Sequence, residues 1–170
     1  MTTQTSQTVQ IHRVYIKASP QAVWDAITKP EWTSKYGYTG FAEFDLRPGG
    51  SHRMRATQEM LDMGAPETMV DGEVIEADPP RRLVLTWRMA MDPAMKAEGF
   101  TRLTYEIDET KVAGTRLTVT HDLTGAPGLY AMVNGQFENV DDGQGAGGGW
   151  AWVLSDLKTL LETGDTIVTH

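Results

Sequence analysis

Residues 149–164 read GWAWVLSDLKTLLETG and form the one long amphipathic helix that the sequence predicts. The apolar residues of this stretch recur every three or four positions, which is the spacing of a buried stripe on an α-helix. They are Trp150, Val153, Leu154, Leu157, Leu160 and Leu161. The pattern predicts a helix over residues 150–162 that ends at Gly164. Such a helix needs an apolar surface to cover, and the segments before it are expected to supply one.

Strand patterns fill most of the chain before this helix. We predict strands over residues 9–18, 38–46, 51–58, 69–77, 82–90, 100–108 and 115–123. In one of them Leu83, Leu85 and Trp87 alternate with residues that face the other way, as in a strand with one buried face. The connections are short, and residues 47–50 (RPGG) are a strong turn signal. We therefore expect an antiparallel meander.

Two short helices are expected after the first strand. Ser19 suits the N-cap of a helix and Pro20 suits its first turn, which predicts a helix over residues 19–28. A second short helix is expected over residues 30–35. The predicted fold is therefore α+β, with a long C-terminal helix packed on a sheet.

The first strand shows a less regular pattern than the others. Ile11, Val14 and Ile16 are expected to face the core together. Because side chains alternate strictly along a strand, this set requires an irregularity near His12 and Arg13.

The composition is that of an ordinary globular domain, with 40% hydrophobic and 22% charged residues among 170. We expect a disordered start at residues 1–8, one domain over 9–164 and a tail at 165–170. The net charge of −8 argues against binding of nucleic acid, which needs a basic face. No apolar run suits membrane insertion and no secretory signal is present, so a cytoplasmic location is expected. The sequence has no cysteine, which excludes a disulfide, a thiol nucleophile and a thiolate metal site. No other metal site and no cofactor are predicted.

Five motifs along the chain resemble the START-like, Bet-v-1-related (SRPBCC) superfamily. They are residues 19–28 (SPQAVWDAIT), 47–50 (RPGG), 78–87 (DPPRRLVLTW), 114–121 (GTRLTVTH) and the GW pair at 149–150. Together they are similar to the branch named after the activator of the ninety-kilodalton heat-shock protein ATPase. The resemblance implies a helix-grip fold, in which a curved antiparallel sheet of about seven strands wraps around the long C-terminal helix. The chain departs from the branch at residues 145–149 (GAGGG), where members often carry a histidine.

A long helix gripped by a curved sheet leaves a space between the two, lined by the inward faces of the strands. Ligand contacts are expected from Met54, Met69, Trp87, Met89, Tyr105, His121, Trp150 and Leu154. Residues 129–137, with Tyr130 and Phe137, are expected to form an extra helix or lid over the mouth of this cavity. A lining of methionine and aromatic residues favours a small apolar or aromatic ligand.

His121 is the leading polar candidate because it continues the inward face of its strand. Its imidazole could hydrogen-bond a ligand carbonyl or act as a general base. The alternative is a structural histidine, bonded to a backbone carbonyl or to Tyr105. Tyr105 is the second catalytic candidate, as a hydrogen-bond donor. His52 ranks behind them, and no role is expected for His12.

The charged residues of the strands are expected to be solvated on the outer faces. This expectation covers the arginines at positions 53, 55, 81 and 82, and it also covers Glu43. No catalytic or binding role is predicted for them.

Three functions remain open on the sequence. The first is binding of a small apolar molecule in the cavity. The second is an enzyme that uses the same cavity for acid–base chemistry, such as cyclisation, dehydration or hydrolysis. The third is a co-chaperone-like regulator of a heat-shock ATPase, which acts through its surface, and a homodimer is compatible with all three.

Overall fold

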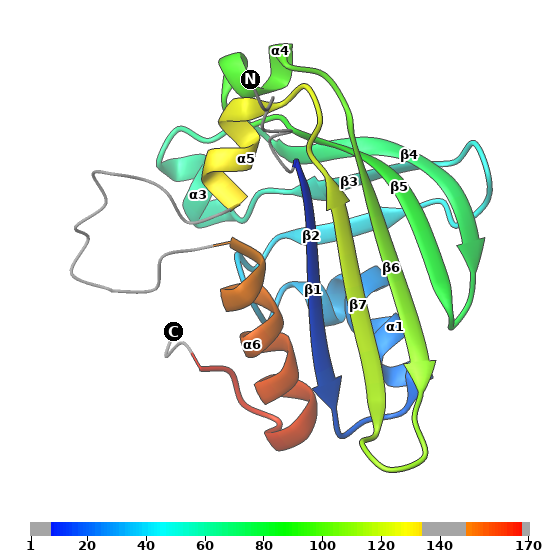
Figure 1. Cartoon of the computed structure of the whole chain (residues 1–170). Coiled ribbons are helices and arrows are strands. Elements are labelled where there is room, and N and C mark those ends of the chain that lie inside the picture. Colours follow the sequence, from blue (N-terminus) through cyan, green and yellow to red (C-terminus); the bar gives the residue numbers. More distant parts are fainter. Residues whose placement is uncertain (1–7, 134–148, 168–170) are drawn as a thin grey trace, which may run out of the picture.

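The structure, a computed structural model, describes residues 8–133 and 149–167. A curved seven-stranded sheet forms its main layer, and the long helix α6 (Gly149–Thr163) lies against it (Figure 1). Several predictions lie outside the described residues. They concern the disordered start up to residue 7, Phe137 of the expected lid, most of the glycine-rich stretch and the last three residues of the tail.

The sheet has the strand order β1-β7-β6-β5-β4-β3-β2, and each neighbouring pair is antiparallel. Its strands are β1 (Val9–Ile16), β2 (Phe41–Phe44), β3 (Ser51–Arg55), β4 (Thr68–Asp78), β5 (Arg82–Met89), β6 (Thr101–Glu109) and β7 (Thr115–Asp122). The chain therefore runs as a meander from β2 to β7, and β1 pairs beside β7. The predicted seven-stranded antiparallel sheet is confirmed.

The helices of the described residues include the three that the sequence predicts and three others of five to seven residues. The predicted ones are α1 (Pro20–Thr28), α2 (Pro30–Thr33) and α6. The hydroxyl of Ser19 accepts from the backbone N–H of Ala22 at 3.1 Å, which is the expected cap of α1. The others are α3 (Gln58–Asp62), α4 (Pro93–Ala97) and α5 (Pro127–Val133), and α5 overlaps the first part of the expected lid segment, residues 129–133.

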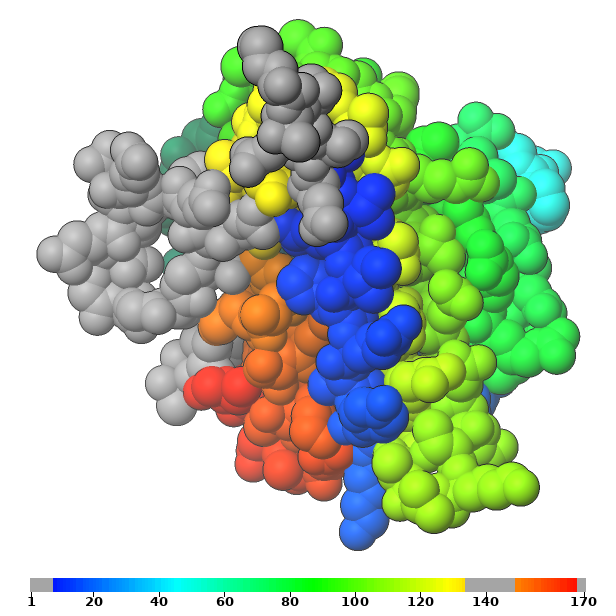
Figure 2. Space-filling view, viewed as in Figure 1, coloured from blue at the N-terminus to red at the C-terminus, as the bar shows by residue number. Residues whose placement is uncertain are grey.

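The first strand is regular, contrary to the prediction of an irregularity. It pairs with β7 without a register shift along its whole length. Strict alternation therefore turns Ile11 outward, where it is 58% exposed, and turns His12 toward the interior. Pairing with β7 determines which side chains of β1 point inward, and the sequence of β1 alone does not contain this information. Figure 2 shows the outer surface of β1 open between β7 and α6.

The main core lies between the sheet and the two longer helices. α6 contacts β1 and α1, and α1 contacts β6 and β7. The buried cluster there includes Val23, Leu85, Leu103, Leu117 and Leu157. The three short helices lie at the opposite end of the strands, because α3 connects β3 to β4, α4 connects β5 to β6, and α5 follows β7 (Figure 1). This end of the sheet carries the candidate site.

A buried carboxylate on α6 holds two neighbouring segments. Asp156 is fully buried, and its Oδ2 accepts from the backbone N–H of Gly37 at 2.9 Å. Its Oδ1 accepts from the backbone N–H of Ile167 at 2.7 Å. The first bond fixes the connection between α2 and β2, where Gly37 has a φ of 60°. The second bond fixes the chain just after α6.

We expect Asp156→Ala to lower the free energy of unfolding by about 1–3 kcal/mol, because the backbone N–H groups of Gly37 and Ile167 lose the carboxylate that accepts from them. Urea unfolding followed by circular dichroism measures the change. Asp165→Ala is the matched control, since Asp165 is exposed on the same end of the chain. Equal stability of the two variants would contradict the structural role of Asp156.

Candidate functional site

A chain of three hydrogen bonds connects α6 to three neighbouring strands. The indole Nε1–H of Trp150 donates to Nδ1 of His121 at 3.2 Å. Nε2 of His121 lies 2.8 Å from Oγ1 of Thr101, and this hydroxyl donates to the carbonyl of Trp87 at 2.8 Å. Since Nδ1 accepts the indole proton and the hydroxyl proton points to Trp87, Nε2 of His121 carries the ring proton. Both imidazole nitrogens and the threonine hydroxyl in this series of hydrogen bonds are thus paired.

The strand register explains why these side chains meet. His121 on β7 pairs with Leu103 on β6, and Thr101 precedes Leu103 by two positions on the same face. Trp87 on β5 pairs directly with Thr101. Side chains of one face point the same way in neighbouring strands, so all of them point toward α6. Trp150 is the second residue of α6 and reaches His121 from the helix side.

Burial controls the ionisation of His121. The ring is fully buried, and this desolvation lowers its pKa to about 4. The imidazole is therefore neutral at pH 7 and both of its nitrogens are engaged. A proton-transfer role for His121 would require the bond from Trp150 to open first. Its predicted roles in ligand contact and in catalysis remain predictions.

Aromatic rings surround the histidine. The ring of Trp87 meets His121 edge-on with centroids 5.3 Å apart, and Trp150 does so at 5.9 Å. Tyr105 in turn packs edge-on against Trp150 at 6.2 Å. Burial raises the pKa of the Tyr105 phenol, so this group stays protonated at neutral pH. Tyr105 can serve as a neutral hydrogen-bond donor, and it has no means of acting as a base there.

Two small apolar clusters and the main core all pack against the partly buried Trp87. One contains Leu129 and Val133 of α5, with Met89, Tyr130 and Trp150 packed against it. The other contains Met69 and Val70 of β4, with Met54, Met60, Leu61 and Met89 packed against it. We call the residues shared by the prediction and these contacts the Trp87 cluster: Met54, Met69, Trp87, Met89, Tyr130 and Trp150. Of the other predicted ligand contacts, Tyr105 and His121 adjoin the cluster through Trp150, and Leu154 lies in the main core.

Two hollows of the described surface lie away from the Trp87 cluster. One of about 600 Å³ is on the outer face of the sheet, over β2 to β5. Its lining includes Glu43, Arg53, Asp71 and Phe100. Another of about 460 Å³ lies among residues near α2 and the end of α6, including Phe41 and Leu160. The space between the sheet and the middle of α6 holds the buried side chains of the main core. A ligand at the Trp87 cluster therefore needs its half-buried side chains, or α5, to move and make room.

His52 and His12 have local partners. His52 is buried, and its Nε2 lies 2.6 Å from the carbonyl oxygen of Thr86. Its ring also stacks on Phe44, with centroids 5.4 Å apart. Nε2 of His12 lies 3.1 Å from Oε1 of Gln10, and burial lowers the pKa of both histidines. The sequence did not single out Gln10, His12 or Thr101 as residues of the inner face of the sheet. Strict alternation from Val14 and Leu103 would have placed them there.

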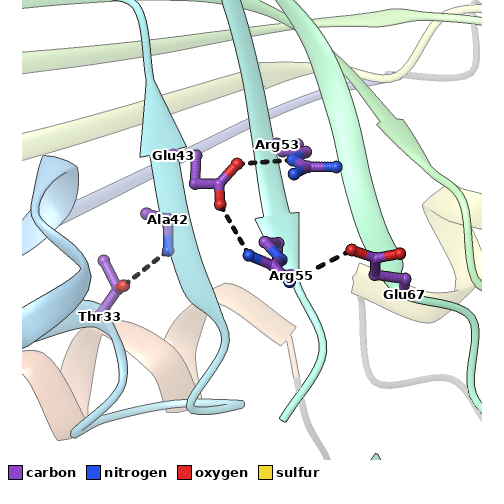
Figure 3. A network of polar contacts seen from close by, with 6 residues as sticks. All are labelled: Thr33, Ala42, Glu43, Arg53, Arg55 and Glu67. Atoms are coloured by element: carbon purple, nitrogen blue, oxygen red, sulfur yellow. Dashed lines mark hydrogen bonds and ion pairs between the residues drawn. The ribbon is translucent and has the colours of Figure 1, made fainter. Parts of the chain in front are cut away.

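The arginines on β3 are exposed on the outer face of the sheet, as expected, but they are paired with glutamates and are not dispersed. Glu43 of β2 binds Arg53 at 2.6 Å and Arg55 at 3.2 Å, and Arg55 also binds Glu67 at 3.2 Å (Figure 3). The two arginines lower the pKa of the Glu43 carboxyl. Cross-strand register brings these side chains together, because Glu43 pairs directly with Arg53. Each pair is exposed and contributes little alone, so the network mainly orders the outer face of β2 and β3.

The other predicted pair of arginines also has partners. Arg81 binds Asp78 at 2.9 Å, and Arg82 binds Glu76 at 3.0 Å.

Among the described residues, no cluster of histidine and carboxylate side chains has the arrangement of a metal site. In that same part of the chain, no helix is long and apolar enough to cross a membrane.

The curved antiparallel sheet and the helix that lies against it define a protein of the START-like helix-grip class. Residues 17–162 match the family model described as Activator of Hsp90 ATPase homolog 1-like protein, and the chain belongs to this family. No curated protein sequence matches the chain.

Solved structures share the fold. Protein SSP2350 from Staphylococcus saprophyticus is 19% identical with a TM-score of 0.62, over 95% of this chain and 97% of that one. The Aha1 dimer from Colwellia psychrerythraea is 20% identical with a TM-score of 0.59, over 92% and 97%. CalU16 from Micromonospora echinospora, in solution, is 21% identical with a TM-score of 0.60, over 95% and 69%. At these identities the likeness concerns the fold.

The neutral, buried state of His121 predicts a specific pH dependence of stability. An unfolded histidine titrates near 6.5, whereas burial lowers the pKa of His121 to about 4. The unfolded chain then binds the proton first, so the stabilisation is complete above pH 6.5 and is lost as the pH falls toward 4. Between pH 7 and 5, the unfolding free energy of the unmodified protein should fall by about 2 kcal/mol more than that of His121→Gln.

Urea unfolding at the two pH values measures this difference. Carboxylates contribute equally to both proteins, so the comparison isolates the histidine. Parallel losses of stability would show that the folded and unfolded states bind the His121 proton equally well.

Proposed function

We propose that this protein binds a small apolar or aromatic molecule at the Trp87 cluster, beneath α5. The observation that carries the proposal is the meeting of two apolar clusters at Trp87, where every side chain of the Trp87 cluster except that of Met69 is only partly buried. Partly buried tryptophan and methionine side chains lose further contact with water when an apolar molecule covers them. Methionine is also flexible enough to repack around such a guest.

The hydrogen-bond chain gives the proposed ligand a polar contact. Trp150 and His121 present an indole N–H and an imidazole nitrogen side by side. A ligand hydroxyl that takes the place of the indole would donate to Nδ1 of His121, and a ligand carbonyl would accept from the freed N–H of Trp150. Neutral ligands that carry one such group fit the site best, because no charged side chain belongs to the chain from Trp150 to Trp87.

Two alternatives have narrower support. Acid–base catalysis would need His121 with a free nitrogen, and both of its nitrogens are bonded. Regulation of a heat-shock ATPase is suggested by the description of the family.

Because the Aha1 structure from Colwellia psychrerythraea is a dimer, we also propose that this chain self-associates, which sedimentation velocity would measure. A cytoplasmic location remains part of the same proposal.

Native mass spectrometry of the protein as isolated, followed by titration with the neutral fluorescent probe N-phenylnaphthylamine, tests the binding function. We expect the probe to bind, and Met89→Gln to weaken its affinity about tenfold, because the amide places polar atoms in the apolar cluster.

Met63→Gln is the matched control, since Met63 is 81% exposed and outside the Trp87 cluster. It should bind the probe as tightly as the unmodified protein. Thermal unfolding checks that both variants fold. The proposal fails if the folded Met89→Gln variant binds normally, or if the control loses the same affinity.

A further inference from the structure

We propose that Glu98 acts as a latch that holds α5 closed over the Trp87 cluster and thereby sets the rate at which ligands enter and leave. This inference rests on the proposed binding function and adds a device that controls access to the site. Glu98 is a positioning residue in this scheme, since it contacts α5 and not the ligand.

The latch is a carboxylate that captures the start of a helix. Oε2 of Glu98 accepts from the backbone N–H of Gly128 at 2.8 Å, and Oε1 accepts from the backbone N–H of Leu129 at 3.1 Å. These N–H groups lie in the first turn of α5, where the helix itself offers them no acceptor. Hydrogen bonds to a charged acceptor are about twice as strong as neutral ones.

The glycine at the contact lets the carboxylate come close. A Cβ placed on Gly128 would lie 3.2 Å from both carboxylate oxygens of Glu98, which is tighter than ordinary contact. No acidic residue of α5 itself lies in its first turn. Glu98 therefore supplies from another element the negative charge that a helix N-terminus favours.

The base of the latch is anchored independently of α5. Glu98 is the residue after α4, and α4 contacts β5. The carboxylate of Asp92 accepts from the backbone N–H of Ala94 at 2.7 Å at the other end of α4. This cap holds the short helix together without any contribution from α5.

The remaining attachment of α5 is small. Leu129 and Val133 are buried in a cluster of four buried residues, separate from the main core. A seven-residue helix with so few buried side chains belongs to the part of a protein that opens most easily. Since Trp87, Met89 and Trp150 pack against this same cluster, opening of α5 uncovers the Trp87 cluster.

Hydrogen–deuterium exchange of the ligand-free protein tests the latch by itself. In Glu98→Gln the charge is lost at nearly constant size, and the amides of residues 128–133 should exchange about tenfold faster. Glu59→Gln is the matched control, because Glu59 is exposed on α3 at the same end of the sheet. Unchanged exchange in Glu98→Gln would overturn the latch whether or not any ligand binds.

Stopped-flow fluorescence with N-phenylnaphthylamine then tests the gate. The association and dissociation rates of the probe should both rise several-fold in Glu98→Gln, while the dissociation constant changes little, because the latch does not touch the probe. Faster exchange of α5 with unaltered probe rates would overturn the gate and leave the binding function standing. Absence of probe binding in the unmodified protein would overturn the gate together with the binding function, and the exchange data would still report on the contact.

Discussion

The hydrogen bonds from Trp150 through His121 and Thr101 to the carbonyl of Trp87 connect the first turn of α6 to three strands. A fully buried imidazole must have both nitrogens paired, because an unpaired polar atom in the interior costs as much as a lost hydrogen bond. Its geometry therefore determines where the indole of Trp150 lies, and the indole of Trp87 packs edge-on against the same imidazole. Those rings are the fixed part of the proposed site, and the methionines and α5 around them are the adaptable part.

The meander separates a rigid end of the sheet from an adaptable one. At the rigid end, α1 and α6 cover leucines and valines in one large buried cluster, and Asp156 ties the neighbouring segments to α6. At the other end, short helices connect the strands and bury small clusters of their own. The main core and the proposed binding site thus lie at different ends of one sheet. This division lets methionines repack near Trp87 without loosening the main core.

Alternation along single strands was enough to predict the seven strands and the inward direction of Trp87 and His121, since side-chain direction is a local property of extended backbone. The long helix followed in the same way from its 3.6-residue period. The prediction for Ile11 failed because the pleat of β1 is set by β7, a partner distant in sequence. Thr101 and Glu98 escaped notice for a related reason. Their roles come from groups that only the folded chain brings near, and neither residue type signals such a role by itself.

The partners of the hydrogen-bond chain also limit what the site can hold. His121 is neutral at pH 7, the phenol of Tyr105 stays protonated, and Thr101 contributes a hydroxyl. A charged ligand group at this place would lose its hydration without gaining an opposite charge, which is costly in a buried environment. A neutral group would exchange one hydrogen bond for another. Glu98 is the charged group that bonds the first turn of α5, through two backbone N–H groups. In the proposed scheme electrostatics therefore serves the closure of the site, and shape together with neutral hydrogen bonds would select the ligand.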